Sequence, residues 1–125
     1  MKNYLFLVLI AASSLVSADP RYVPTERDVL GELSQRSKLP EAELKQILSN
    51  CDINQTNTNL CAYRDQIVVE LTFKHAIDEW EKARDTDCAK SAERDYGGGS
   101  MKPTAQAICV IAETKKMIQR IRRVK

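Results

Sequence analysis

The stretch from Cys51 to Cys88, CDINQTNTNLCAYRDQIVVELTFKHAIDEWEKARDTDC, carries the strongest fold signal in this chain of 125 residues. From Leu60 onward its apolar residues recur at helical spacing, and one face holds Leu60, Tyr63, Ile67 and Leu71. A second apolar stripe lies on nearly the opposite face and holds Val69, Phe73, Ile77 and Trp80. We predict a helix whose two halves either pack against different partners or are separated by a bend near residues 71–72.

Helical signals also flank this stretch on both sides. Thr25 can cap one helix, and Pro40 suits the first turn of another. Residues 52–59 are rich in Asn and Thr, lack periodicity and are expected to form a loop. Residues 97–99 are glycines that end the regular structure, and Pro103 opens a last helix. The inner side of that helix is expected to hold Ala107, Ile108, Ile111, Ile118 and Ile121. We therefore expect an all-α domain of about four helices.

The first eighteen residues have the pattern of a secretory signal. A short positive start precedes an apolar run from Tyr4 to Leu15, and small residues precede a cleavage point after Ala18. The run is shorter than the roughly 20 apolar residues that span a bilayer. No cysteine lies near the cleavage point, so a lipid anchor is not expected. We predict an exported protein, periplasmic or secreted and soluble once the signal is removed.

Export makes disulfides possible, and the chain has four cysteines. Three pairings are possible for four cysteines. We favour Cys51–Cys61 and Cys88–Cys109 because both loops are then short and local, each stabilising by roughly 3 kcal/mol. A zinc site would need closely spaced Cys and His ligands, which the sequence lacks, so no metal is expected.

Composition excludes some classes of function. Beyond residue 18 the chain has 18 basic and 17 acidic residues, whereas a general nucleic-acid binder has a strong basic excess. No phosphate loop, dinucleotide fingerprint or calcium loop is present, so no cofactor is expected. His75 is the single histidine, and no nucleophile motif accompanies it. The many carboxylates alternate with Lys and Arg, as on a solvated helix face. We do not expect an enzyme.

Several motifs occur in a fixed order from Cys51 onward. The first is Cys51-Asp-Ile-Asn-Gln55-Thr56-Asn-Thr-Asn59-Leu60-Cys61-Ala62, and the second is Trp80-Glu-Lys-Ala-Arg84-Asp85-Thr-Asp-Cys88. Gly98-Gly99-Ser100-Met101, Cys109 and Thr114 follow. In their residues and their order these motifs resemble the LprI-type lysozyme-inhibitor domains of bacterial envelopes. The resemblance covers residues 51–125, which we take as the four-cysteine domain. Residues 19–50 have no recognised counterpart and are expected to form a helical extension.

The chain departs from that family in two places. The family usually has an extra helical arm between the second cysteine and the tryptophan, but here Cys61 lies only nineteen positions before Trp80. We therefore expect a shortened or missing arm. The family's arginine three residues after the threonine is replaced by Met117.

Each matched residue has a structural and a functional interpretation. Trp80 is expected to be a core residue. Arg84-Asp85 is either a recognition pair or an internal salt bridge that orients the Cys88 loop. Gln55, Thr56 and Asn59 either hydrogen-bond within their own loop and cap the next helix, or contact a partner. Gly98 and Gly99 supply positive φ for a turn.

The resemblance implies a protein that inhibits a lysozyme-like peptidoglycan hydrolase by stoichiometric binding. We expect the loop between Cys88 and Cys109 to enter the hydrolase cleft, with Ser100 and Lys102 contacting its carboxylates. One alternative is an immunity protein against a secreted toxin that degrades the cell wall. Others are a structural or assembly protein of the envelope, and a secreted effector with its own activity.

Overall fold

The computed structural model describes residues 22–124, which form four helices and no strand. The helices are α1 (Glu26–Ser37), α2 (Glu41–Leu48), α3 (Gln55–Tyr96) and α4 (Lys102–Arg123). The expected all-α class with about four helices is confirmed. The expected signal and its cleavage after Ala18 lie outside the described residues. None of the described helices is long and apolar enough to cross a membrane.

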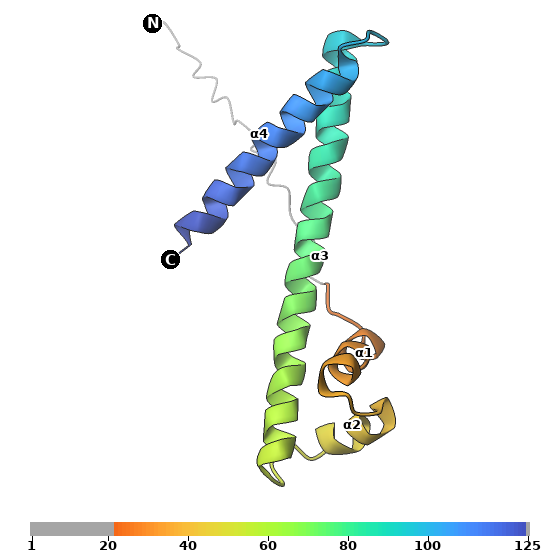
Figure 1. The fold of residues 1–125 in the computed structure, drawn as a ribbon, viewed down its shortest axis with the longest axis vertical. Helices are drawn as coiled ribbons and strands as arrows, with labels where there is room; N and C mark the ends of the chain where they lie inside the picture. The colour runs from red at the N-terminus through yellow and green to blue at the C-terminus, as the bar shows by residue number, and fades with distance from the viewer. Residues whose placement is uncertain (1–21, 125) are drawn as a thin grey trace, which may run out of the picture.

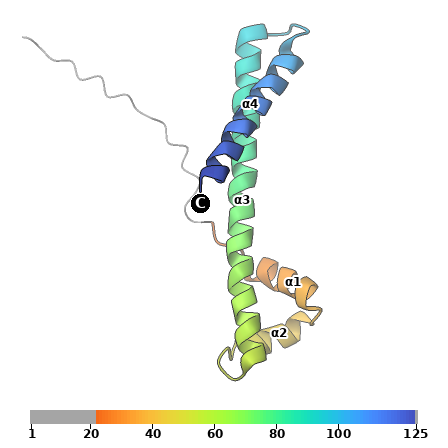
Figure 2. The same ribbon diagram turned by 60° about the vertical axis from the view of Figure 1, so that its left-hand side comes forward.

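Helix α3 is the spine of the molecule. It runs for 42 residues and continues unbroken through residues 71–72, where the second alternative placed a bend. Helices α1 and α2 pack against its first half, and α4 folds back along its second half (Figure 1). Helix α4 diverges from α3 toward the C-terminus in Figure 1, and it crosses in front of α3 in the view of Figure 2. The two halves of α3 therefore have different partners, as the first alternative predicts. The second apolar stripe is only partly used, because Val69 and Phe73 are 69% and 61% exposed.

The hydrophobic core lies between α1, α2 and the first half of α3. Its buried members are Val29, Leu30, Leu33, Leu44, Leu60 and Ile67. Thr25 caps α1, because its hydroxyl oxygen accepts a hydrogen bond from the Asp28 N–H at 3.2 Å. A left-handed residue, Lys38 at φ 62°, ends α1, and Pro40 is the N-cap of α2. The signals read from the sequence thus mark the boundaries of both short helices.

Residues 52–59 do not form a loop throughout, so that expectation is partly wrong. Helix α3 begins at Gln55, because the Asn54 side chain accepts a hydrogen bond from the Asn57 N–H at 2.9 Å and caps the helix. The Asn57 side chain also donates to the Asn50 carbonyl at 2.8 Å. Thr58 donates to the Cys51 carbonyl at 2.9 Å. The polar residues of this segment therefore start a helix and tie the preceding turn to it.

The two disulfides have the pairing favoured from the sequence. Cys51 and Cys61 join the turn before α3 to its second turn, with Cα atoms 5.9 Å apart. Cys88 and Cys109 join α3 to α4, with Cα atoms 5.6 Å apart. The second bond is a covalent link between two helices, so it fixes how α4 leaves the end of α3.

The expected inner side of α4 is wrong. Ile108, Ile111, Ile118 and Ile121 are 62%, 53%, 43% and 51% exposed, and Ala107 is also exposed. None of the residues of α4 is buried. The residues that face α3 include Cys109, Glu113 and Met117. Because Cys109 is bonded to Cys88, the side of α4 that holds Cys109, Glu113 and Met117 faces α3. The isoleucines lie on another side of the helix and face solvent.

Candidate functional site

The turn between α3 and α4 forms the apex of a helical hairpin, at the end of α3 far from α1 and α2 (Figure 1). Gly97 ends α3 with φ +51°, and its N–H donates to the Glu93 carbonyl at 2.8 Å. Gly99 allows a close approach, since a Cβ added there would lie 3.0 Å from the Tyr96 carbonyl oxygen. Gly98 has no positive φ, and a Cβ added there would meet no atom within 4 Å. The positive φ expected of Gly98 and Gly99 is therefore found at Gly97.

The side chains at the apex point largely into solvent. Ser100 is exposed, and Tyr96 and Met101 are 52% and 55% exposed. Lys102 forms an ion pair with Glu93 of the last turn of α3. The cation that we expected to face a partner is thus partly neutralised within the molecule. The apex offers an aromatic ring, a hydroxyl, a thioether and a paired ammonium group, held by a turn that the Cys88–Cys109 bond closes.

Arg84 lies at the junction of α3 and α4. Its Nη1 donates to Thr114 Oγ1 at 3.1 Å, and its Nη2 lies 2.8 Å from Asp85 Oδ1. Its guanidinium carbon lies 5.0 Å from the centroid of the Trp80 ring, within the range of a cation–π contact. The Arg84 side chain is 13% exposed. These contacts match the salt-bridge interpretation of the Arg84-Asp85 pair, because they use Arg84 to join the helices.

A cleft of about 920 Å³ opens between α3 and α4 next to this junction. Trp80 and Ile77 line it from α3, and Met117 and Arg120 line it from α4. Trp80 is half-buried and does not belong to the hydrophobic core. The expectation of a core tryptophan is therefore wrong. Helix α4 diverges before it can cover the ring fully.

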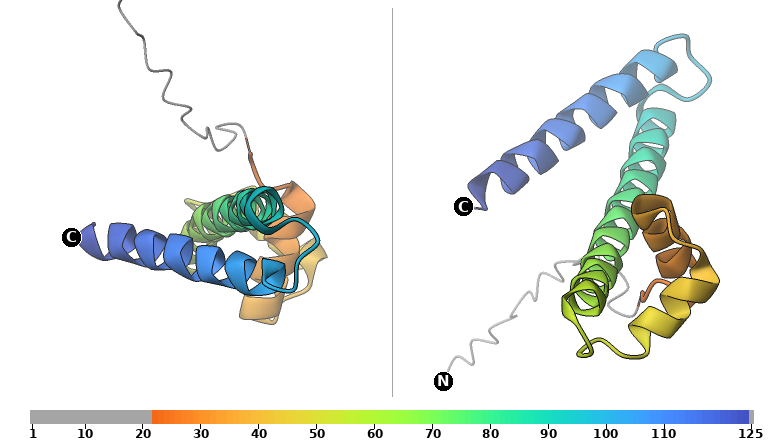
Figure 3. Two further views of the ribbon diagram at one scale, coloured as in Figure 1. Left: turned by 90° about the horizontal axis from the view of Figure 1, so that it is seen from above. Right: turned by 60° about the horizontal axis from the view of Figure 1, so that its bottom comes forward.

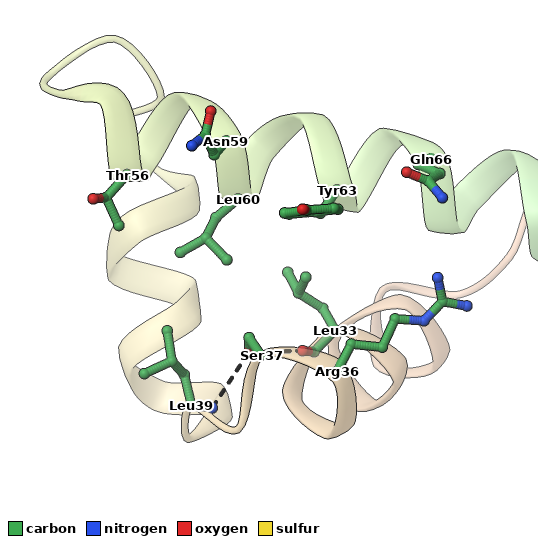
Figure 4. A pocket seen from close by; sticks show the side chains of 9 residues that line it. All are labelled: Leu33, Arg36, Ser37, Leu39, Thr56, Asn59, Leu60, Tyr63 and Gln66. Carbon is green, nitrogen blue, oxygen red and sulfur yellow. Dashed lines mark hydrogen bonds between the residues drawn. The ribbon is translucent and has the colours of Figure 1, made fainter.

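Three residues of the first family motif, Thr56, Asn59 and Leu60, line a groove between α1 and α3 (Figure 4). The groove measures about 540 Å³. Its walls are Leu33, Arg36, Ser37, Leu39, Thr56, Asn59, Leu60, Tyr63 and Gln66. Thr56 and Asn59 are exposed, and Tyr63 is 56% exposed. Neither Thr56 nor Asn59 caps α3, but Asn59 accepts a hydrogen bond from Gln55, as the local interpretation predicts. Contact of Thr56 and Asn59 with a partner stays a prediction.

Gln55 has a local role in the same turn. Its side-chain nitrogen donates to Asn59 Oδ1 at 2.8 Å, which fixes the Asn59 amide and leaves its NH₂ group facing outward as a donor. Sequence reasoning missed Tyr63 as a surface residue. Its helical spacing with Leu60 and Ile67 placed it on the core face, but it lines the open α1–α3 groove.

The Arg36 guanidinium at the edge of this groove bridges α1 and α3. Its Nη2 lies 2.6 Å from Glu70 Oε2, and its Nε donates to Glu32 at 2.8 Å. The hydrogen bond from Arg36, followed by one from Gln66, holds the pKa of Glu70 below its usual range. The charges here are thus engaged with one another and fix the position of α1 on α3.

The single histidine of the chain, His75, lies in the middle of α3. His75 stacks on Tyr22, with ring centroids 3.7 Å apart, and so packs against the segment before α1. Within residues 22–124 no cluster of His, Cys, Asp and Glu side chains could hold a metal ion.

Comparison with known proteins gave one family. The family model described as "Lysozyme inhibitor LprI" matches residues 23–121. No curated protein and no solved structure matches the chain. The matched range begins before Cys51 and includes α1 and α2, so the similarity extends further toward the N-terminus than the motifs indicated.

Proposed function

Because this chain belongs to the LprI lysozyme-inhibitor family, we propose that it inhibits a lysozyme-like peptidoglycan hydrolase by binding it stoichiometrically. The proposal includes export of the chain through cleavage after Ala18, so that it meets such enzymes in the periplasm or outside the cell. The protein acts by occupying a site and not by catalysis.

One observation carries the choice of contact surface: the turn at the apex is both exposed and covalently closed. Glycosidases of this kind hold two carboxyl groups in an open cleft. A protruding turn can enter such a cleft, where the Ser100 hydroxyl donates a hydrogen bond to a carboxylate. The Cys88–Cys109 bond limits the motion of the turn before binding, so little ordering entropy is lost on association.

The ion pair of Lys102 changes how the cation would act. A carboxylate of the hydrolase has to compete with Glu93 for the Lys102 ammonium group. Lys102 therefore contributes to binding by exchanging one carboxylate partner for another. This exchange is expected to reduce its net contribution to affinity, because the pair in the free protein is lost.

The direct test is titration of peptidoglycan hydrolysis with the processed, oxidised protein. The panel should contain animal lysozymes of the chicken and goose types and several bacterial muramidases. Inhibition that reaches completion at one inhibitor per enzyme supports the proposal. Absence of inhibition and of binding across the panel would favour a structural role in the envelope. An immunity role would be indicated by selective inhibition of a wall-degrading toxin encoded next to this chain.

A further inference from the structure

The second half of α4 is strongly basic, in contrast to the rest of the molecule. Residues 114–124 contain five basic residues and no acidic one, whereas residues 22–113 contain 16 acidic and 11 basic residues. We call the five residues the basic end: Lys115, Lys116, Arg120, Arg122 and Arg123. Glu113 is the one carboxylate of α4, and it pairs with Lys116 at 2.7 Å. The basic charge thus exceeds what the complementation of a helix C-terminus requires.

The same part of α4 has an apolar stripe that the molecule leaves uncovered. We define the isoleucine stripe as Ile111, Ile118 and Ile121, which are 53%, 43% and 51% exposed. At 100° per residue the three side chains fall within an arc of about 80°. They lie beside the residues that line the α3–α4 cleft, and Lys115 and Arg122 border their outer side. The C-terminal end of α4 extends away from α1 and α2 (Figure 3).

From this combination we infer that α4 binds reversibly to the surface of an anionic phospholipid bilayer. A helix with an apolar stripe bordered by Lys and Arg lies in the plane of the interface, with the stripe among the acyl chains and the cations at the headgroups. Basic clusters next to such a stripe are attracted by the negative potential of anionic lipids. The positive charge of the basic end is the reason for proposing an anionic bilayer and not an uncharged partner.

A second copy of the chain fits the same surface less well. A symmetric dimer through the isoleucine stripe would bring Lys115 and Arg122 of one protomer close to the same residues of the other. Like charges so close oppose association. An anionic surface instead gains from every one of these cations. The apex lies at the opposite end of α4, so binding to a bilayer leaves the surface proposed for the hydrolase accessible (Figure 1).

The test is flotation of the processed, oxidised protein with two kinds of vesicle. One contains equal parts of phosphatidylglycerol and phosphatidylcholine, and the other contains phosphatidylcholine alone. We expect binding to the first kind that weakens as salt is added, and much weaker binding to the second. Ile118→Ser combined with Ile121→Ser, and separately Arg122→Glu combined with Arg123→Glu, should each weaken the binding by at least about tenfold.

A matched control distinguishes the effect of charge on α4 from the effect of the net charge of the protein. Lys74→Glu combined with Lys90→Glu changes the net charge by the same amount on exposed positions of α3, and should leave vesicle binding unchanged. Equal weakening by this control would overturn the proposal, as would absence of binding to the anionic vesicles. Sedimentation that reveals a dimer dissolved by the two isoleucine substitutions would assign the stripe to a second copy instead. All variants should retain the wild-type helical circular dichroism spectrum.

Discussion

Arg84 on α3 donates a hydrogen bond to Thr114 on α4, with 3.1 Å between Nη1 and Oγ1. Thr114 in turn donates to the carbonyl of Val110 at 2.7 Å, so its hydroxyl links the guanidinium to the α4 backbone. The contact matters because none of the residues of α4 is buried. Helix α4 is held by this hydrogen bond, by the Lys102–Glu93 pair and by the Cys88–Cys109 bond, with limited apolar packing.

Thr114→Val should therefore loosen α4. The substitution keeps the shape of the side chain but leaves the poorly exposed Arg84 without one acceptor, which should cost about 1–2 kcal/mol. For a domain of this size the melting temperature should fall by roughly 4–8 °C for each kcal/mol. Thr114→Ser retains the hydroxyl and should remain close to wild type. Identical melting curves for the two variants would show that the hydrogen bond has no net effect on stability.

Trp80→Ala should destabilise less than loss of a core tryptophan. Truncation of a fully buried Trp costs about 3–5 kcal/mol, but Trp80 is half-buried and borders an open cleft. We expect a loss nearer to 1–2 kcal/mol, consistent with partial burial of the ring. As the single tryptophan, its emission reports on this cleft directly. In the folded protein, emission that iodide quenches supports the half-buried position, and a blue-shifted, unquenched spectrum would contradict it.

The sequence predicts the helices well because their signals are local. The Thr25 cap and the period of the long helix depend on residues that are neighbours in the chain. The segment around Asn54 is misjudged because Asn can cap a helix or stay in a loop, and its neighbours determine which. The isoleucines of α4 are misplaced for a different reason. Periodicity identifies an apolar face, but it does not say whether another part of the same chain covers it.

The candidate site is predictable only in part, because contacts between helices are not specified by local sequence signals. The order of the motifs identifies the residues of the apex turn, and the glycines identify a turn. That Lys102 pairs with Glu93 depends on how the two helices meet, which the sequence pattern does not specify. The groove at Thr56 and Asn59 likewise forms only when α1 packs beside α3.

Removal of the Cys88–Cys109 bond should release α4 while leaving the core intact. The bond closes a separation of 21 residues and is expected to stabilise by about 3 kcal/mol. Cys88→Ser combined with Cys109→Ser should therefore raise amide hydrogen exchange throughout α4. Exchange around Leu33 and Ile67, in the core of α1–α3, should change much less. Uniformly faster exchange in both regions would mean that the molecule unfolds as one cooperative unit.

The Arg36–Glu70 pair should make the stability of the fold depend on pH in the acidic range. The Arg36 hydrogen bond lowers the pKa of Glu70 in the folded protein, so the pair stabilises at pH above the ordinary glutamate pKa. That contribution is lost as the pH falls below this value and through the lowered one. Glu70→Gln should slightly lower the melting temperature at neutral pH and flatten its decline in acid. The exposed Glu81→Gln is the control and should leave the profile unchanged, whereas parallel wild-type and Glu70→Gln profiles would contradict the prediction.

Substitutions at the apex should change inhibition of the hydrolase while the Cys88–Cys109 bond still joins α3 and α4. Lys102→Glu places two carboxylates together at the turn and should weaken inhibition and its sensitivity to salt, because a cation facing two carboxylates is replaced by an anion. Glu93→Gln removes the internal competitor for Lys102, so it should strengthen inhibition. Both variants lose the Lys102–Glu93 pair, so opposite shifts of the inhibition constant, measured well below each melting temperature, would assign Lys102 to the contact. Equal inhibition by wild type and both variants would move the contact away from the apex, and Asn59→Ala in the α1–α3 groove would then be the next variant to titrate.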